Sequence, residues 1–111
     1  MSQSTCMKIR LKPGMTEVYL DFTKQVLNRK DELTASLKEQ GIIAQHIFLE
    51  RSPNGDFIFF YLKSEDLAKT RDTLYSSKRK IDLEMREMVD AAWDTSQVTR
   101  LRTRLIEFAR R

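Results

Sequence analysis

The chain has 111 residues, of which 41% are hydrophobic and 32% charged with a net charge of +4, a composition that excludes a fibrous or disordered protein. This length suits one domain with its own hydrophobic core, so we expect a single domain over residues 1–111. No stretch approaches the roughly 18 consecutive apolar residues of a membrane span, and the first residues lack the apolar core of a secretory signal, so we expect a cytoplasmic protein.

The first expected element is a strand over residues 7–12, MKIRLK. In this segment each apolar residue is followed by a basic one, which is the period of a strand with two unlike faces. Pro13 and Gly14 then end the strand.

A long helix is expected over residues 16–40. Thr16 is a plausible N-cap, Glu17 suits the positive end of the helix dipole, and Gly41 is a natural residue to follow the last turn. The apolar residues recur at helical spacing, and they are Val18, Phe22, Val26, Leu33 and Leu37.

A β-hairpin is expected next, with strands over 42–51 and 56–63 joined by the turn sequence Ser-Pro-Asn-Gly. The first of these strands should carry Ala44, His46, Phe48 and Glu50 on one side, and Ile43, Ile47 and Leu49 on the other. Two registers are open. A four-residue loop pairs Arg51 with Asp56 and places His46 across from Tyr61, whereas a three-residue loop pairs Ser52 with Asp56 and places His46 across from Leu62.

Two more helices are expected after the hairpin. Ser64 is the expected N-cap of a helix over 64–77, and a third amphipathic helix follows the basic bend at 78–80. Its apolar positions are Ile81, Met85, Met88, Val89, Ala92 and Trp93.

The tail fits either a helix or a strand. Because a last strand beside the first would complete a βαββαβ sheet, we expect a strand near 100–108. The arginine-rich segment 99–111 holds five arginines against one glutamate, which equals the whole net charge of +4. The rest of the chain is neutral, so its surface is not broadly basic.

The predicted fold is therefore α+β and ferredoxin-like, with helices on one face of an antiparallel sheet. The central strand is apolar at every position from Phe57 to Leu62, so it offers apolar side chains to both faces. Leaving three of them in water would forfeit several kcal/mol at about 1.5–3 kcal/mol each. We therefore expect a homodimer in which a second copy of the sheet covers the open face.

The order of elements, with MKIRLKPG, EQG, FLERSPNGDFIFFYLKSEDL and IDLEMREMV, resembles the ferredoxin-like dimeric α/β barrel superfamily. Most of all it is similar to a family of uncharacterised bacterial proteins within that superfamily, over residues 7–93. The resemblance implies two sheets packed into a barrel, with a chamber lined by each protomer's open sheet face and helix ends. The superfamily spans heme-degrading and quinol monooxygenases, dehydratases, sugar mutarotases and modules without chemistry, so the fold implies no one activity.

The chain is only distantly similar to the rhamnose mutarotases, which use a tyrosine and a histidine on the first helix. Tyr19 falls where that tyrosine would lie, but Thr23 stands near the histidine position. The mutarotase activity is therefore not transferred to this chain.

His46 is the only histidine, and Glu50 shares its expected face, so the two could transfer protons through a ligand. One histidine and one cysteine in different strands do not make a metal site, and the chain lacks a Gly-rich phosphate loop, so no metal or cofactor is expected. The candidate chamber residues are Arg10, His46, Glu50, Phe59 and Tyr61. They predict a small-molecule enzyme or binder. The alternative is a noncatalytic dimerisation module.

RNA-recognition domains share the βαββαβ order and stack bases on aromatic residues of the third strand. Aligned on Phe57 and Phe59, Asp56 stands where that motif has glycine and Ile58 where it has a small residue. The first strand also lacks an aromatic partner. Nucleic-acid binding is therefore the less favoured reading.

Overall fold

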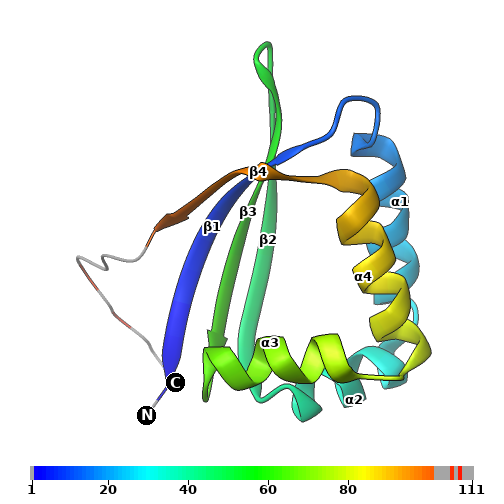
Figure 1. Cartoon of the computed structure of the whole chain (residues 1–111), viewed down its shortest axis with the longest axis vertical. Helices are drawn as coiled ribbons and strands as arrows, with labels where there is room; N and C mark the ends of the chain where they lie inside the picture. Colours follow the sequence, from blue (N-terminus) through cyan, green and yellow to red (C-terminus); the bar gives the residue numbers. More distant parts are fainter. Residues whose placement is uncertain (1, 102–105, 107, 109–111) are drawn as a thin grey trace.

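The computed structural model describes residues 2–101, 106 and 108. Its elements are β1 (Gln3–Leu11), α1 (Thr16–Leu27), α2 (Lys30–Glu39), β2 (Ile42–Ser52), β3 (Gly55–Ser64), α3 (Leu67–Ser76), α4 (Lys80–Ala92) and β4 (Trp93–Leu101). The strands form one antiparallel sheet in the order β2-β3-β1-β4. Figure 1 shows all the helices on one side of this sheet. The predicted ferredoxin-like α+β fold is confirmed.

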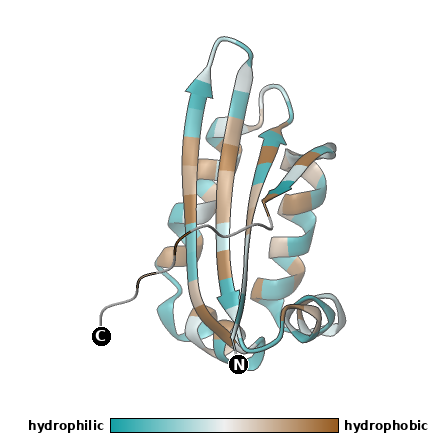
Figure 2. Cartoon of the chain, turned by 90° about the vertical axis from the view of Figure 1, so that its left-hand side faces the viewer, coloured by the Kyte–Doolittle hydropathy of each residue, from teal (hydrophilic) through white to brown (hydrophobic). Residues whose placement is uncertain are grey.

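The two faces of β3 differ in what covers them. Ile58 pairs with Ile9 of β1, and both are buried against the helices, at 1% and 0% exposure. Phe60 packs on the same core, so alternate residues of β3 face the helices. The residues between them, Phe57 and Phe59, face the side that Figure 2 turns toward the viewer, with the helices behind the sheet.

The hairpin adopts the first of the two predicted registers. Arg51 pairs with Asp56, and His46 lies across from Tyr61. The turn closes with the pair Ser52 and Gly55, and Gly55 has a φ of +125°, a conformation that favours glycine.

The predicted single helix over 16–40 is wrong, because the chain forms two helices that part at Asn28 and Arg29. Arg29 has a ψ of 58°, outside the helical range, and its guanidinium donates to Glu32 of α2 and to Glu84 of α4. This bridge ties the junction to α4 and sets the start of α2. The predicted bounds of the helical region are confirmed, since α1 begins at Thr16 and Gly41, with a φ of +73°, follows the last turn of α2. The predicted N-cap is wrong, because Met15 occupies that position and the Thr16 hydroxyl donates to the Asp56 carboxylate at 2.7 Å.

The predicted cap at Ser64 is also wrong. Ser64 is the last residue of β3 and is fully buried, and the N-cap of α3 is Asp66. The carboxylate of Asp66 accepts hydrogen bonds from the backbone N–H groups of Ala68 and Lys69 at 3.0 and 3.2 Å. A side-chain oxygen two residues further along the chain thus satisfies the first turn.

A last strand beside β1 is confirmed, but it begins at Trp93 rather than near residue 100. The Trp93 ring packs edge-on against Tyr19 and Phe60, which draws the chain into the sheet directly after α4. Of the predicted range 100–108, residues 100–101 lie in β4, and 106 and 108 do not lie in a strand. Residues 102–105 and 107 lie outside the described residues.

Candidate functional site

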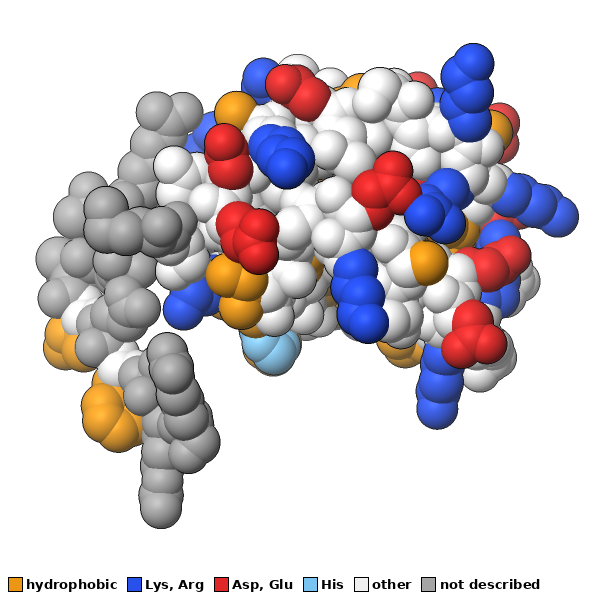
Figure 3. All heavy atoms as spheres, turned by 90° about the horizontal axis from the view of Figure 1, so that it is seen from below, with side chains coloured by type: hydrophobic (Ala, Val, Ile, Leu, Met, Phe, Trp, Pro, Cys, Tyr) orange, Lys and Arg blue, Asp and Glu red, His pale blue; other side chains and the backbone are white. Residues whose placement is uncertain are grey.

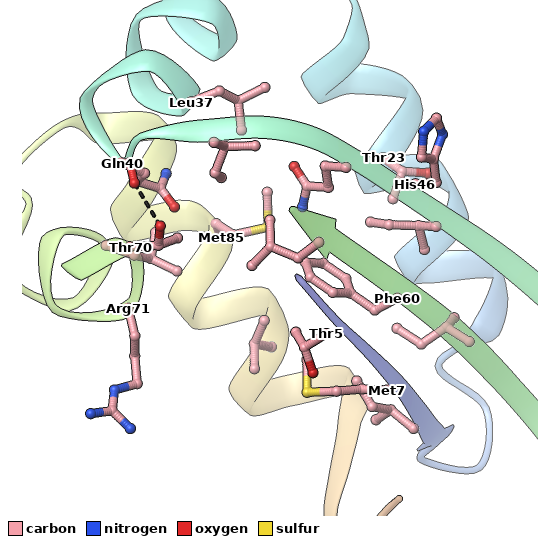
Figure 4. Close-up of a pocket in the computed structure, with 18 of the residues that line it drawn as sticks. Thr5, Met7, Thr23, Leu37, Gln40, His46, Phe60, Thr70, Arg71 and Met85 are labelled. Atoms are coloured by element: carbon pink, nitrogen blue, oxygen red, sulfur yellow. Dashed lines mark hydrogen bonds between the residues drawn. The ribbon is translucent and has the colours of Figure 1, made fainter. Parts of the chain in front are cut away.

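A large cavity lies between the helices and the face of the sheet that they cover. Its volume is about 1430 Å³, above the roughly 300–1,000 Å³ of ordinary ligand pockets. Figure 4 shows part of its wall, with Met7 and Phe60 from the sheet and Leu37 and Met85 from the helices. Residues from both faces of the edge strand β2 line this space, so it is open to solvent and is not an enclosed void in the protein interior.

The Tyr19 hydroxyl and the Trp93 indole N–H are polar groups in the mostly apolar wall of the cavity. Tyr19 is 2% exposed, and the burial of its phenol raises the pKa of that group, while the nearby indole N–H of Trp93 lowers it by less. The two rings meet edge-on with centroids 6.5 Å apart. The indole nitrogen is fully buried and has no hydrogen bond of standard geometry with any atom in the described part of the chain.

The opposite end of the cavity holds a polar network that is satisfied internally. Asp82 of α4 is 4% exposed and accepts hydrogen bonds from the hydroxyls of Ser36 and Ser77, both at 2.5 Å. The side-chain amide of Gln40 donates to the Ser36 hydroxyl at 2.9 Å. The Thr70 hydroxyl donates to the backbone carbonyl of Gln40 at 2.6 Å, which is the dashed bond in Figure 4. This network ties α2, α3 and α4 together, so its oxygens are committed to the fold.

Gln45 places an amide in the wall made by β2. It pairs with Leu62 of β3 and lies on the helix-facing side of the sheet, among apolar residues that line the cavity. Within residues 2–101, no hydrogen bond engages its side chain. The sequence could have indicated this residue, because it is a polar position on the face of β2 that also carries Ile47 and Leu49.

The cavity reaches the free edge of the sheet. β2 is an edge strand, and residues from both of its faces line the cavity. Those from the opposite face are Ala44, His46 and Phe48. A molecule could therefore enter past β2 without a break in the sheet.

The five predicted chamber residues lie together on the bare face of the sheet. Register pairs place Arg10 beside Phe57, Phe59 opposite Phe48, and Glu50 opposite Phe57, and the His46 and Tyr61 rings are 6.0 Å apart. Figure 3 shows the histidine at the surface.

Lys8 sits among the aromatic residues of this face. Its ammonium lies 4.5 Å from the centroid of the Phe57 ring, 5.5 Å from that of Phe59, and 3.9 Å from the Glu50 carboxylate. Phe48 is 64% exposed. The bare face is therefore apolar, with its charges held over aromatic rings.

The described residues contain neither a cluster of metal ligands nor a helix that could cross a membrane. Three or more His, Cys, Asp or Glu side chains do not gather there in a way that could hold a metal ion. In the same residues, each helix is too short or too polar to cross a membrane.

Three solved structures share this fold. A conserved protein from Methanosarcina mazei Go1 has a TM-score of 0.59 and 14% identity, and the match covers 94% of each chain. A Pseudomonas aeruginosa protein has a TM-score of 0.56 and 13% identity over 94% of this chain and 93% of its own. A Nitrosomonas europaea protein of unknown function has a TM-score of 0.52 and 14% identity over 96% of this chain and 93% of its own. At these identities the likeness shows the fold alone.

The sequence itself matches one family model. DUF6176, a family of unknown function, matches residues 2–109. No protein with a curated description matches the chain.

Proposed function

We propose that this chain, which belongs to the DUF6176 family of unknown function, binds a small apolar molecule in the cavity between its sheet and its helices. We propose further that two copies pair through their bare sheet faces. The observation that carries the binding proposal is a cavity of about 1430 Å³ with mostly apolar walls. The polar groups at its Asp82 end are already paired with one another.

The size of the cavity argues that something fills it. The space opens to solvent past β2, so water and not vacuum fills it when no ligand is bound. Water can fill the space, but apolar walls offer it few hydrogen-bond partners. An apolar ligand that displaces such water gains the hydrophobic free energy of the wall.

The small buried core supports the same conclusion. Among the described residues, seven hydrophobic side chains are buried in the single chain, and five of these line the cavity: Ile9, Tyr19, Val26, Ile58 and Ile81. Many more apolar side chains of the wall are only half-buried, including Phe60 and Met85. A ligand would complete their burial.

A fluorescent titration tests the binding proposal. Nile red, a neutral apolar dye, should become brighter when it is added to the purified protein. Val89→Phe on α4 enlarges a side chain that lines the cavity and should weaken dye binding. Leu83→Phe makes the same kind of enlargement on the same helix at a residue that is 41% exposed and does not line the cavity, so it should bind the dye like the wild type. Equal dye binding by the wild type and both variants would contradict the proposal.

The homodimer proposal is supported by the aromatic residues of the bare sheet face, of which Phe48 is exposed and the others are half-buried. Phe48, Phe57, Phe59 and Tyr61 share one side of the sheet and lack cover from the described helices. A second copy would cover them by a two-fold axis, and Arg10, His46 and Glu50 would then lie in the interface with them. If the two sheets enclose a chamber, these are the residues that would line it. Sedimentation of the wild type should give twice the protomer mass of 13.1 kDa, and a single protomer at micromolar concentration would contradict pairing.

A noncatalytic dimerisation module is the second candidate, because the bare face alone would account for assembly. It predicts the dimer without the ligand. Sedimentation as a dimer together with failure to bind Nile red would favour this candidate.

A further inference from the structure

We propose that the ligand of the inner cavity is an uncharged apolar molecule with a carbonyl oxygen, and that this oxygen accepts hydrogen bonds from Tyr19 and Trp93. This inference rests on the proposed binding function. It adds the chemical class of the ligand and the end of the cavity where its oxygen lies.

The first reason is that two donors, the Trp93 indole N–H and the Tyr19 hydroxyl, stand in the same wall and are close to each other but to no other acceptor in the described residues. The Trp93 indole N–H is fully buried and has no standard hydrogen bond with a described residue. The Tyr19 side chain lines the cavity, and the polar side chain beside its phenol is that same indole, which lowers the pKa of the phenol. Buried polar groups in native proteins are nearly always hydrogen-bonded, so an unpaired indole at a cavity wall points to a missing acceptor.

The second reason is that the two groups are held in place. The Trp93 ring packs edge-on against Phe60, with centroids 5.9 Å apart, and against Tyr19. Tyr19 is 2% exposed on α1, and Trp93 directly follows α4. An oxygen that reached both groups would therefore meet donors that are already oriented, and little side-chain freedom would be lost on binding.

The third reason concerns charge. Tyr19 is neutral at ordinary pH, as any phenol is, and burial raises the pKa of its phenol further; an indole carries no charge at ordinary pH. This end of the cavity therefore supplies hydrogen-bond donors without a positive charge. The Asp82 carboxylate at the other end already accepts two hydroxyl groups. At this end of the cavity a ketone or aldehyde oxygen fits better than a carboxylate, because an unpaired charge is costly to bury. The two arginines of the wall, Arg71 and Arg100, belong to α3 and to the end of β4 that is far from Trp93.

Three compounds of nearly equal shape test the inference by isothermal titration calorimetry. They are 2-acetylnaphthalene, which has the carbonyl, 2-ethylnaphthalene, which lacks oxygen, and 2-naphthoate, which is an anion. The wild type should bind the ketone about tenfold more tightly than the hydrocarbon, the gain expected from one or two net hydrogen bonds. It should bind the anion most weakly.

Two variants test whether the tighter binding of the ketone depends on the two donors. Tyr19→Phe removes only the hydroxyl, and Trp93→Phe removes the N–H and keeps an aromatic ring. Each should reduce the preference for ketone over hydrocarbon to about threefold or less. The ratio is taken within one variant, so a general loss of stability cancels from it. The carbonyl stretching frequency of the bound ketone should also rise in each variant, as a hydrogen bond is lost.

The outcomes separate this inference from the binding proposal. Equal affinity for the ketone and the hydrocarbon in the wild type would overturn the carbonyl assignment while the cavity still binds apolar molecules. A preference for the anion would overturn the claim of an uncharged ligand. Failure of all three compounds and of Nile red would overturn the binding function as well.

Discussion

Phe48→Ala should weaken the pairing of two copies by a predictable amount. Phe48 lies on the bare face of β2, opposite Phe59, and 64% of it is exposed in the single chain. Full burial of a phenylalanine is worth about 1.5–3 kcal/mol, so the part still exposed accounts for about 1–2 kcal/mol in each copy. A two-fold interface contains the residue twice. The variant should therefore lose about 2–4 kcal/mol of pairing free energy, or roughly 30- to 1,000-fold in dimer Kd.

Sedimentation velocity over a range of concentrations measures this change. The wild type and Phe48→Ala are compared with Leu83→Ala, which removes an exposed apolar side chain from α4 on the helix side of the molecule. Leu83→Ala should leave the dimer Kd within about threefold of the wild type. If both substitutions weaken the dimer equally, or neither does, the bare sheet face is not the interface.

Two further predictions concern stability. Burial raises the pKa of Tyr19 above its ordinary value of 10.0, so the folded protein holds the phenol proton more tightly than the unfolded chain does. The stability that results is fully present below pH 10.0 and is lost as the pH rises through the pKa of the folded state. Tyr19→Phe should therefore flatten the fall in the urea-unfolding free energy above pH 10.0, and an unchanged slope would count against a buried phenol. Asp82→Ala should lower the unfolding free energy by about 2–4 kcal/mol, because it leaves the hydroxyls of Ser36 and Ser77 without their acceptor. Asp82→Asn keeps an acceptor oxygen and should lose less, so equal losses would show that this network contributes little.

The sheet could be predicted from the sequence because its signals are local. Alternation in residues 7–12 placed Ile9 and Leu11 inside, and the structure buries both. The Ser-Pro-Asn-Gly turn limited the hairpin to two registers, and one of these is observed. The uninterrupted apolar run of β3 correctly indicated a strand with apolar side chains on both faces.

The helix break and the cavity could not be predicted in the same way. The break depends on Arg29 reaching Glu84, a contact between residues far apart in the sequence. Periodicity reports which side of a helix is apolar, but it does not report how far the helix axis lies from the sheet. That distance decides whether Phe60 and Met85 touch each other or line a cavity. For the same reason the sequence placed Trp93 among the apolar positions of the third helix, whereas it is the first residue of β4, and its unpaired N–H could not be foreseen.

The most direct measurement would locate a ligand inside the protein by NMR of ¹³C-methyl-labelled methionines. Met7 and Met85 line the cavity, whereas Met15 and Met88 pack against the core without lining it. Addition of 2-acetylnaphthalene should shift the methyl signals of Met7 and Met85 and produce contacts between these methyl groups and the ring protons of the ligand. Unchanged signals from both residues at saturating ligand, with the protein folded, would contradict a binding site between the sheet and the helices.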